Sequence, residues 1–467
     1  MLEWLVTVSD FLWSYLLVAL LLGCALLFTL RSRFVQFGFL REMFRLLGES
    51  TSKSADGQRH ISSFEAFVIS LASRIGTGNL AGVATALFVG GPGAVFWMWL
   101  IALLGAATAF VESTLAQLYK VRGKDSFVGG PAYYIRKGLK KPWMASLFAV
   151  LIIVNFAFAF NSVQSNTICA AFDYAFGVSP LWMGIVLVVM TLLIIFGGVQ
   201  RIAKVSSVIV PFMALGYIVL ALVVIVMNIG MLPDVLSLIF RHAFGLEQTM
   251  GGVFGVAVMQ GVKRGLFSNE AGEGSTPNAA ATATVSHPVK QGLIQALGVF
   301  SDTLVICSCT AFIILMSGVP LDEANGIRLT QQALVATLGP NGGVFVAVSI
   351  FFFAFSSILG NYYYGEANLR ILSESKWAMF VFRLLTGGWV LFGALTALDV
   401  VWTIADITMA LQTLCNLVAL FGLSKYALKL LNNYRAQKRS GVKDPVFHRD
   451  MLPEIEEDIE CWQKEND

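Results

Sequence analysis

The sequence predicts an all-α protein that crosses a membrane many times. Of its 467 residues, 57% are hydrophobic and only 13% are charged, and the mean hydropathy is +0.73. A soluble domain usually has about a quarter of its residues charged, so this apolar fraction is too large for one water-soluble core. Long apolar stretches recur along the chain, and glycines and charged residues interrupt two of them. Together these observations predict a polytopic helix bundle with two broken members.

The apolar stretches are long enough to be membrane spans. A span needs roughly 20 predominantly apolar residues, and each should be helical because backbone groups cannot stay unpaired in hydrocarbon. We count about eleven transmembrane helices, at residues 11–30, 64–88, 94–119, 143–171, 180–198, 205–228, 250–282, 291–316, 341–367, 377–398 and 400–423. The first is not predicted to be a cleaved signal, because its apolar core exceeds the usual 7–15 residues.

The distribution of positive charge predicts the orientation. With the N-terminus outside and the spans alternating, the inside loops hold 26 of the 32 Lys and Arg residues. The outside loops hold two, Arg241 and Arg328. Positive charge is enriched in cytoplasmic loops, so we expect a multi-pass protein of the cell inner membrane with its C-terminus inside. The small net charge of +3 gives no indication of nucleic acid as a partner.

The chain divides into four parts. Residues 1–63 hold one span and a cytoplasmic amphipathic segment, 64–228 and 250–424 hold five spans each, and 425–467 form a cytoplasmic tail. The tail is first basic and then acidic. Charged runs with little apolar surface need no fold, so a solvated tail is expected.

Histidine and cysteine placement argues against an enzyme. The four histidines lie in loops or the tail, at His60, His242, His287 and His448. A membrane redox enzyme needs metal or haem ligands inside the bundle, and the cysteines show no metal-binding spacing. The sequence also contains no motif of a selectivity filter, which argues against a channel. We therefore expect neither catalytic residues nor a bound cofactor.

The first interrupted stretch reads LASRIGTGNL, from Leu71 to Leu80. Its two glycines weaken a helix, and Arg74 and Asn79 are costly at membrane depth. We predict a helix unwound at Ile75–Gly78, whose second half begins near Asn79. The free amides of such a helix start bind carboxylates, and the unwound carbonyls can bind a cation. The alternative is a small-residue packing groove, which does not explain Arg74 and Asn79.

The second interrupted stretch is Gly261–Pro277, which contains four glycines. It also contains two cations and two carboxylates, namely Lys263, Arg264, Glu270 and Glu273. We predict a half-helix, a break and a second half-helix. The alternative is a loop between short spans, but the apolar run 278–282 is too short to cross alone. The roles of these charges stay open, and Arg74 with Glu270 could form a structural ion pair.

The two broken stretches occupy corresponding positions. Each opens a set of five spans, and an odd number gives the two sets opposite orientations in the membrane. Paired broken helices in inverted halves indicate a transporter's central site. Other spans add polar groups, at Asn155, Asn161, Gln164, Ser356, Ser357, Trp402 and Asp406. Each alone could be an interhelical hydrogen bond, but together they favour a secondary transporter.

Five motifs follow one another along the chain: RIGTGNLAGV at 74–83, GGPGAVFWMW at 90–99, the stretch 261–277, GNYYYGE at 360–366 and VWTIADI at 401–407. Together they resemble one family, the alanine/glycine:cation symporters. The likeness covers about residues 60–425, with departures at Ser73 and Glu273, where glycine and an apolar residue are usual. It implies a five-plus-five inverted-repeat bundle of the leucine-transporter type, with one extra N-terminal helix. It also implies sodium symport of alanine or glycine; another small amino acid or proton coupling remains open.

We place sodium between the first broken span and the eighth span of the repeats. Its ligands would be backbone oxygens near Ala72 and Ile75 and the hydroxyls of Ser356 and Ser357. Carbonyls and hydroxyls suit a hard cation.

We place the amino acid beside it. Its carboxylate would meet the amides of Thr77 and Gly78 and the side chain of Asn79. Its ammonium would face oxygens of the second broken span, near Phe267, Ser268 and Asn269, with Gln164 closing the side. Phe267 would limit side-chain size. We expect the protein to function as a monomer in the lipid bilayer.

Overall fold

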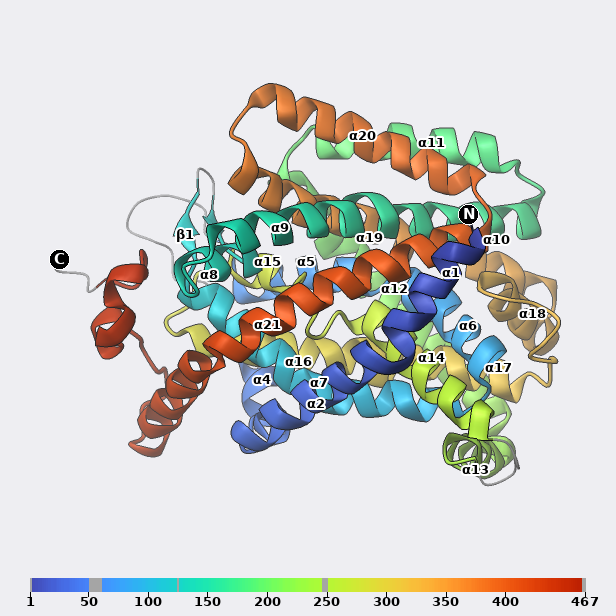
Figure 1. Ribbon diagram of the computed structural model, residues 1–467. Helices are drawn as coiled ribbons and strands as arrows, with labels where there is room; N and C mark the ends of the chain where they lie inside the picture. The colour runs from blue at the N-terminus through green and yellow to red at the C-terminus, as the bar shows by residue number, and fades with distance from the viewer. Residues whose placement is uncertain (1, 50–60, 124–125, 246–250, 464–467) are drawn as a thin grey trace.

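The structure is a computed structural model that describes residues 2–49, 61–123, 126–245 and 251–463. Helices make up nearly all of it (Figure 1). The described strands are β1 (Val121–Arg122) and β2 (Phe127–Val128), which pair antiparallel in a small hairpin. The all-helical membrane fold predicted from the sequence is therefore confirmed.

Each of the eleven predicted spans contains one or more described helices. Eight described helices are long and apolar enough to cross a membrane, or nine when one bent pair counts as a single span. The two remaining predicted spans are the 16-residue helix α11 (Pro180–Ile195) and the polar helix α14 (Gly251–Asn269) with its short partner α15 (Pro277–Ala280).

The two sets of five spans follow one another along the chain. The first set consists of α5 (Ser63–Arg74) with η2 (Gly78–Gly82) and α6 (Val83–Gly90), α7 (Gly93–Leu118), α9 (Pro142–Ile152) with η3 (Ile153–Phe160) and α10 (Asn161–Phe176), α11, and α12 (Val199–Met227). The second consists of α14 with α15, α16 (Pro288–Val299) with η5 (Phe300–Cys307) and α17 (Ser308–Met316), α19 (Pro340–Leu372), α20 (Lys376–Leu395) and α21 (Leu398–Arg439). The extra N-terminal span is α1 (Leu2–Phe11), η1 (Leu12–Leu17) and α2 (Val18–Arg31).

The first broken span starts with a capping box and stops where predicted. The hydroxyl of Ser62 accepts from the Glu65 amide, and the Glu65 carboxylate accepts from the Ser62 amide, which satisfies two free donors of the helix start. Helix α5 ends at Arg74, since Ile75 is extended at φ −77° and ψ 92°. The chain then resumes as η2 and α6, bent by 49° from α5.

The second broken span stops between α14 and α15. Three residues there have positive φ: Glu270 at 57°, Gly272 at 94° and Gly274 at 83°. L-residues rarely adopt this backbone region, whereas glycine does so readily. Glu112 of α7 secures the break, because its carboxylate accepts from the amide of Gly272 at 3.1 Å and from the Asn416 side chain at 2.9 Å. The predicted break is confirmed.

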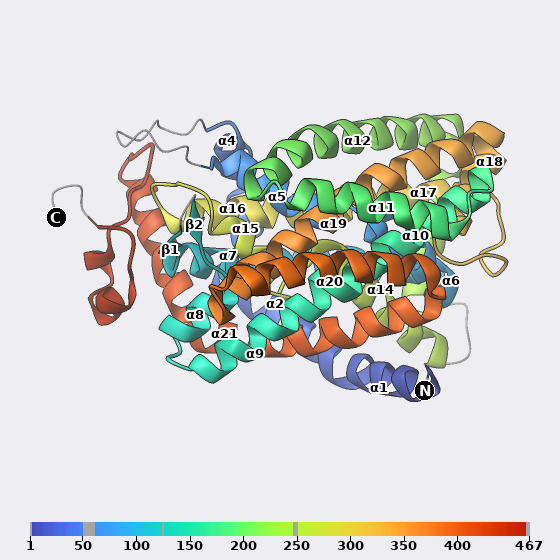
Figure 2. The same cartoon turned by 90° about the horizontal axis from the view of Figure 1, so that it is seen from above.

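The helices pack as two groups with the breaks between them. Helix α7 packs against α14, α16 and α2, while α10 packs against α19 and α20, and α11 against α20. Figure 1 shows α11 and α20 along one side of the bundle and α7, α16 and α2 along the other, and Figure 2 shows the same bundle turned by 90°. The broken helices α5 and α14 lie in the interior, where almost all their residues near the breaks are buried.

Several shorter helices lie between the spans. The amphipathic segment expected after the first span is present as α3 (Val35–Gly38) and α4 (Leu40–Leu47). Others were not predicted, namely α8 (Pro131–Lys137), η4 (Ile229–Met231), α13 (Leu232–Ala243) and α18 (Ile327–Leu338). Helix α18 packs on α10, α17 and α19, so the connection between α17 and α19 is folded.

The expectation of a solvated tail is wrong. Helix α21 continues to Arg439, well past the predicted end of the last span. Residues 441–463, which we call the strap, then fold back onto the bundle and include η6 (Arg449–Met451) and η7 (Pro453–Asp458). Their apolar side chains Phe447, Ile455 and Ile459 are buried. These few side chains give the charged segment an apolar face, which averaged composition did not reveal.

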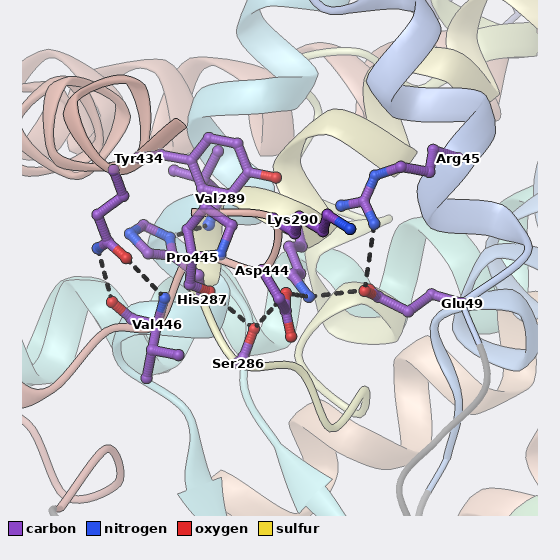
Figure 3. A network of polar contacts seen from close by, with 12 residues as sticks. Arg45, Glu49, Ser286, His287, Val289, Lys290, Tyr434, Asp444, Pro445 and Val446 are labelled. Carbon is purple, nitrogen blue, oxygen red and sulfur yellow. Dashed lines mark hydrogen bonds and ion pairs between the residues drawn. The ribbon is translucent and has the colours of Figure 1, made fainter. Parts of the chain in front are cut away.

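Polar contacts fix the strap to the start of α16 (Figure 3). Asp444 pairs with the buried Lys290, which also pairs with Glu49 at 2.9 Å. The Phe447 amide donates to the carbonyl of Ser286 at 2.9 Å. Burial lowers the pKa of His287 to about 3, so this ring is neutral. It packs between Tyr434 and Phe447.

The other end of the strap contacts α7 and α8. The indole of Trp462 donates to the carbonyl of Gln117 at 3.0 Å, and Glu460 pairs with Lys137 at 2.8 Å. The strap therefore covers the ends of three helices, α7, α8 and α16, at one end of the bundle (Figure 1).

Candidate functional site

The first break faces helix α19. The hydroxyl of Ser357 lies 2.9 Å from the carbonyl oxygen of Ala72 and 3.3 Å from that of Ile75. A Cβ added to Gly76 would stand 2.2 Å from the same hydroxyl, so only glycine allows this approach. The structure thus brings together three of the four residues predicted to bind sodium.

The fourth residue, Ser356, contacts a different oxygen. Its hydroxyl donates to the carbonyl of Phe353 at 2.8 Å, and the Ser357 hydroxyl lies 3.1 Å from that same carbonyl. Phe353 was not among the predicted residues, because a backbone carbonyl has no side-chain signature in the sequence. The Ser357 hydroxyl thus contacts three carbonyls, and Ser356 reaches this group through the Phe353 carbonyl; all these residues are buried, and oxygen ligands suit a hard cation such as sodium.

The amides after the break point toward polar side chains. The Gly76 amide donates to the side-chain oxygen of Asn79, and the Thr77 amide donates to the side-chain oxygen of Gln164, both at 2.9 Å. The hydroxyl of Thr77 is buried without a hydrogen-bond partner in the described part of the chain. Buried polar atoms usually have a hydrogen-bond partner, and a bound ligand would supply one for this hydroxyl.

The two breaks touch at Gly78. A Cβ added there would lie 3.0 Å from the Cα of Ser268 and 3.1 Å from a ring carbon of Phe267. The Phe267 ring is held between Phe160, at 4.3 Å between ring centroids, and Trp402, at 4.6 Å. The predicted residues of both broken spans therefore do meet, with an aromatic wall on one side.

A buried carboxylate, Asp302 of η5, links the two broken spans and was missed. It accepts from the Asn79 side chain at 2.7 Å, from the Ser268 hydroxyl at 2.6 Å and from the Thr303 hydroxyl at 3.0 Å. A charged residue within an apolar span is costly. This signal drew attention to Arg74, and it could have identified Asp302 in the same way.

Asn269 joins this group only through Thr303. Its amide nitrogen donates to the Thr303 hydroxyl at 3.2 Å, and its oxygen accepts from the Ala271 amide at 3.0 Å. Its side chain is thus directed toward η5 and the second break.

Arg74 and Glu270 form no direct ion pair, so the open alternative of a contact between them is not met. Arg74 donates to the carbonyl of Gln295 at 3.3 Å. Glu270 instead accepts from Ser73 at 2.7 Å and from Ser275. Glu273 accepts from Asn155 at 2.6 Å. These contacts bind the second break to neighbouring helices.

Three segments around the site are π-helical, namely η2, η3 and η5. A π-helix holds one extra residue per turn and is frequent at functional sites. These segments supply Gly78, Asn79 and Asp302, and α10 with Gln164 follows η3 directly. The sequence offers no simple signal for this irregularity.

Comparison with known proteins identifies related chains. The family model described as the sodium:alanine symporter family matches residues 1–449. The probable sodium/glutamine symporter GlnT of Bacillus subtilis is 52% identical over 455 residues, covering 97% of this chain and 94% of that protein. The amino-acid carrier protein AlsT of the same organism is 50% identical over 457 residues, covering 98% and 97%.

A more distant relative and a solved structure agree with this grouping. The sodium/alanine symporter AgcS of Methanococcus maripaludis is 39% identical over 442 residues, covering 92% of this chain and 97% of that protein. The crystal structure of MhsT in complex with L-phenylalanine is similar in fold, with a TM-score of 0.55 at 15% identity, covering 80% of this chain and 96% of that chain. The inverted-repeat architecture expected from the sequence is thereby confirmed.

Proposed function

Since the chain belongs to the sodium:alanine symporter family and is a sodium-coupled amino-acid symporter, we propose that it carries alanine or glycine into the cell. The observation that supports this cargo most directly is the first break. There the hydroxyl of Thr77 has no hydrogen-bond partner among the described residues, and the Thr77 amide donates to the side-chain oxygen of Gln164, beside Gly78 and Phe267. An amide at a helix start suits a carboxylate, which would accept from Thr77 in place of Gln164, and the close aromatic ring suits a small side chain.

Sodium would act by joining the first broken span to α19. In this proposal it binds the carbonyls of Ala72, Ile75 and Phe353 with the hydroxyls of Ser356 and Ser357. Because these ligands come from α5 and α19, the ion stabilises one arrangement of the broken span against its partner. Bound sodium would therefore favour the substrate-competent state, and alternating access would follow as one group rocks about the fixed site.

Uptake of labelled alanine into proteoliposomes tests the cargo and the ion together. An inward sodium gradient should drive accumulation, a potassium gradient should not, and glycine should compete with alanine. Accumulation driven equally by a proton gradient without sodium would contradict the proposal.

Replacing Ser357 should weaken sodium binding. In Ser357→Ala the hydroxyl that faces Ala72 and Ile75 is lost, so the sodium concentration for half-maximal uptake should rise about tenfold, equivalent to about 1.4 kcal/mol. Ser349→Ala is the matched control, since Ser349 is a buried serine of the same helix whose hydroxyl has no partner in the described residues. An unchanged sodium dependence in Ser357→Ala would place the ion elsewhere.

The orientation follows from the positive charges and is a proposal as well. A cysteine introduced at Ser179, before α11, should react with a membrane-impermeant maleimide in intact cells. A cysteine at Lys204, at an exposed position in the first turns of α12, should react only after permeabilisation. The reverse pattern would show that the N-terminus lies inside.

A further inference from the structure

Three arginines gather where the extra N-terminal span meets the end of α21. The guanidinium of Arg435 donates to the carbonyl of Ser32 at 2.6 Å and lies over the ring of Phe39, 5.5 Å from its centroid. Arg33 and Arg439 lie close enough to Arg435 to repel it electrostatically. We call Arg33, Arg435 and Arg439 the arginine cluster.

The arginine cluster has no neutralising partner in the described part of the chain. The neighbouring ion pairs join Glu42 to Arg45 and to Lys438. Arg33 and Arg439 are exposed, and no ion pair among the described residues includes a member of the cluster. Like charges held together repel one another, so a bound anion would stabilise this arrangement.

An unusual turn presents Arg33 beside an exposed phenylalanine. Arg33 and Phe34 have φ angles of 52° and 55°, a backbone region that L-residues rarely adopt. The Phe34 amide donates to the carbonyl of Thr29 at 2.8 Å, which holds the turn at the end of α2. Backbone of this kind is found most often at ligand-binding and functional sites.

A row of aromatic rings runs from this turn to a membrane span. The ring centroids of Phe34 and Phe37 are 6.5 Å apart, and Phe37 stacks on Phe300 of η5 at 6.1 Å. Phe34 and Phe37 are 50% and 48% exposed. Because η5 is part of a long apolar span, the row connects the arginine cluster to the hydrocarbon region of the bilayer.

We propose that the arginine cluster and this aromatic row together bind one anionic phospholipid, with its phosphate at the arginines and an acyl chain along the phenylalanines. Guanidinium groups match phosphate oxygens with several directed N–H donors, and basic clusters at the membrane surface favour acidic headgroups. Exposed aromatic rings alone would fit any lipid, whereas the unpaired arginines select an anionic one. A free phosphate compound would leave the rings uncovered.

The position of this lipid predicts what it does. It would join the end of α2, α3 and η5 to the end of α21, and so hold the extra N-terminal span against the second set of five spans. A ligand that binds only the folded protein raises its unfolding temperature. The proposal concerns the lipid-facing surface, so its outcome is independent of which amino acid is transported.

The purified protein in a neutral detergent provides the first test. Phosphatidylglycerol should raise the unfolding temperature and remain bound in native mass spectrometry. Phosphatidylcholine with the same acyl chains should do neither at the same concentration. Equal effects of the two lipids would overturn the proposal. An equal rise with inorganic phosphate at that concentration would also overturn it, because the site would then bind a free anion without using the aromatic row.

The double variant Arg33→Gln/Arg439→Gln assigns the effect to the arginine cluster. The phosphatidylglycerol concentration for half-maximal stabilisation should rise at least about tenfold, and Arg33→Lys/Arg439→Lys should recover part of this loss. Arg136→Gln/Lys141→Gln is the matched control, since it removes two exposed cations beside α8 and α9. It should respond like the native protein. A native response in Arg33→Gln/Arg439→Gln would place the lipid elsewhere.

Discussion

Gly78→Leu is expected to abolish sodium-driven alanine uptake, lowering the initial rate by at least 100-fold. Even a methyl group at this position would press on the Cα of Ser268 at 3.0 Å and on the Phe267 ring at 3.1 Å. A leucine side chain would push the two broken spans apart at the place where the substrate's backbone groups are proposed to bind. Initial uptake rates in proteoliposomes of equal protein content measure the effect.

Two further variants distinguish a loss of substrate binding from misfolding of the protein. Gly388→Leu changes a glycine of α20 that has open space around its Cβ position, so uptake should persist. Gly78→Ala should be impaired to an intermediate degree. Size-exclusion chromatography in detergent should show a monodisperse peak for each variant. Normal uptake by Gly78→Leu would mean that the first break is a packing groove between helices.

Asp302→Leu should have the second-largest effect, with a loss of transport of at least 100-fold and a lower unfolding temperature. The change removes the acceptor of three buried donors, from Asn79, Ser268 and Thr303. Each unsatisfied donor costs about 1–3 kcal/mol. Because Asn79 and Ser268 come from different broken spans, the loss also leaves their direct hydrogen bond, at 3.1 Å, without the carboxylate that both side chains share.

Two comparisons define the role of Asp302. Asp302→Asn keeps one side-chain oxygen, so it should retain more of the unfolding temperature than Asp302→Leu does. Asp234→Leu, at an exposed position on α13, should change neither quantity. Thermal unfolding followed by intrinsic fluorescence, together with alanine uptake, gives both readouts. Transport at the native level in Asp302→Leu would remove Asp302 from the site.

The most informative parts of the sequence were the polar and glycine residues that interrupt its apolar stretches. Glycines and charges within long apolar stretches predicted both helix breaks, because unpaired backbone and charge are tolerated at membrane depth only inside a polar site. The same reasoning found Asn79 and Gln164, which the structure brings to the first break. Side chains with a distinctive chemistry were therefore predictable from their place in the chain.

What the sequence did not reveal depends on geometry. The Phe353 carbonyl has the same chemistry as every other carbonyl, so only its position beside Ser357 distinguishes it. The Arg74–Glu270 pair was suggested by charge alone, but the two side chains point to different neighbours. The strap was missed because its partners are distant in sequence, as with Trp462 and Gln117.

The position of the strap at the C-terminal end also determines when it can pack onto the bundle during synthesis. Residues 441–463 leave the ribosome after every span has been made, and chains generally fold from the N-terminal side first during synthesis. The ends of α7 and α16 therefore stay uncovered until translation has passed the last span. A chain that terminates just after α21 lacks Asp444 beside Lys290 and Phe447 beside His287, although Lys290 keeps Glu49 and His287 keeps Tyr434. Such a product would be a complete bundle without its final cover, which cellular proteases could distinguish from the finished protein.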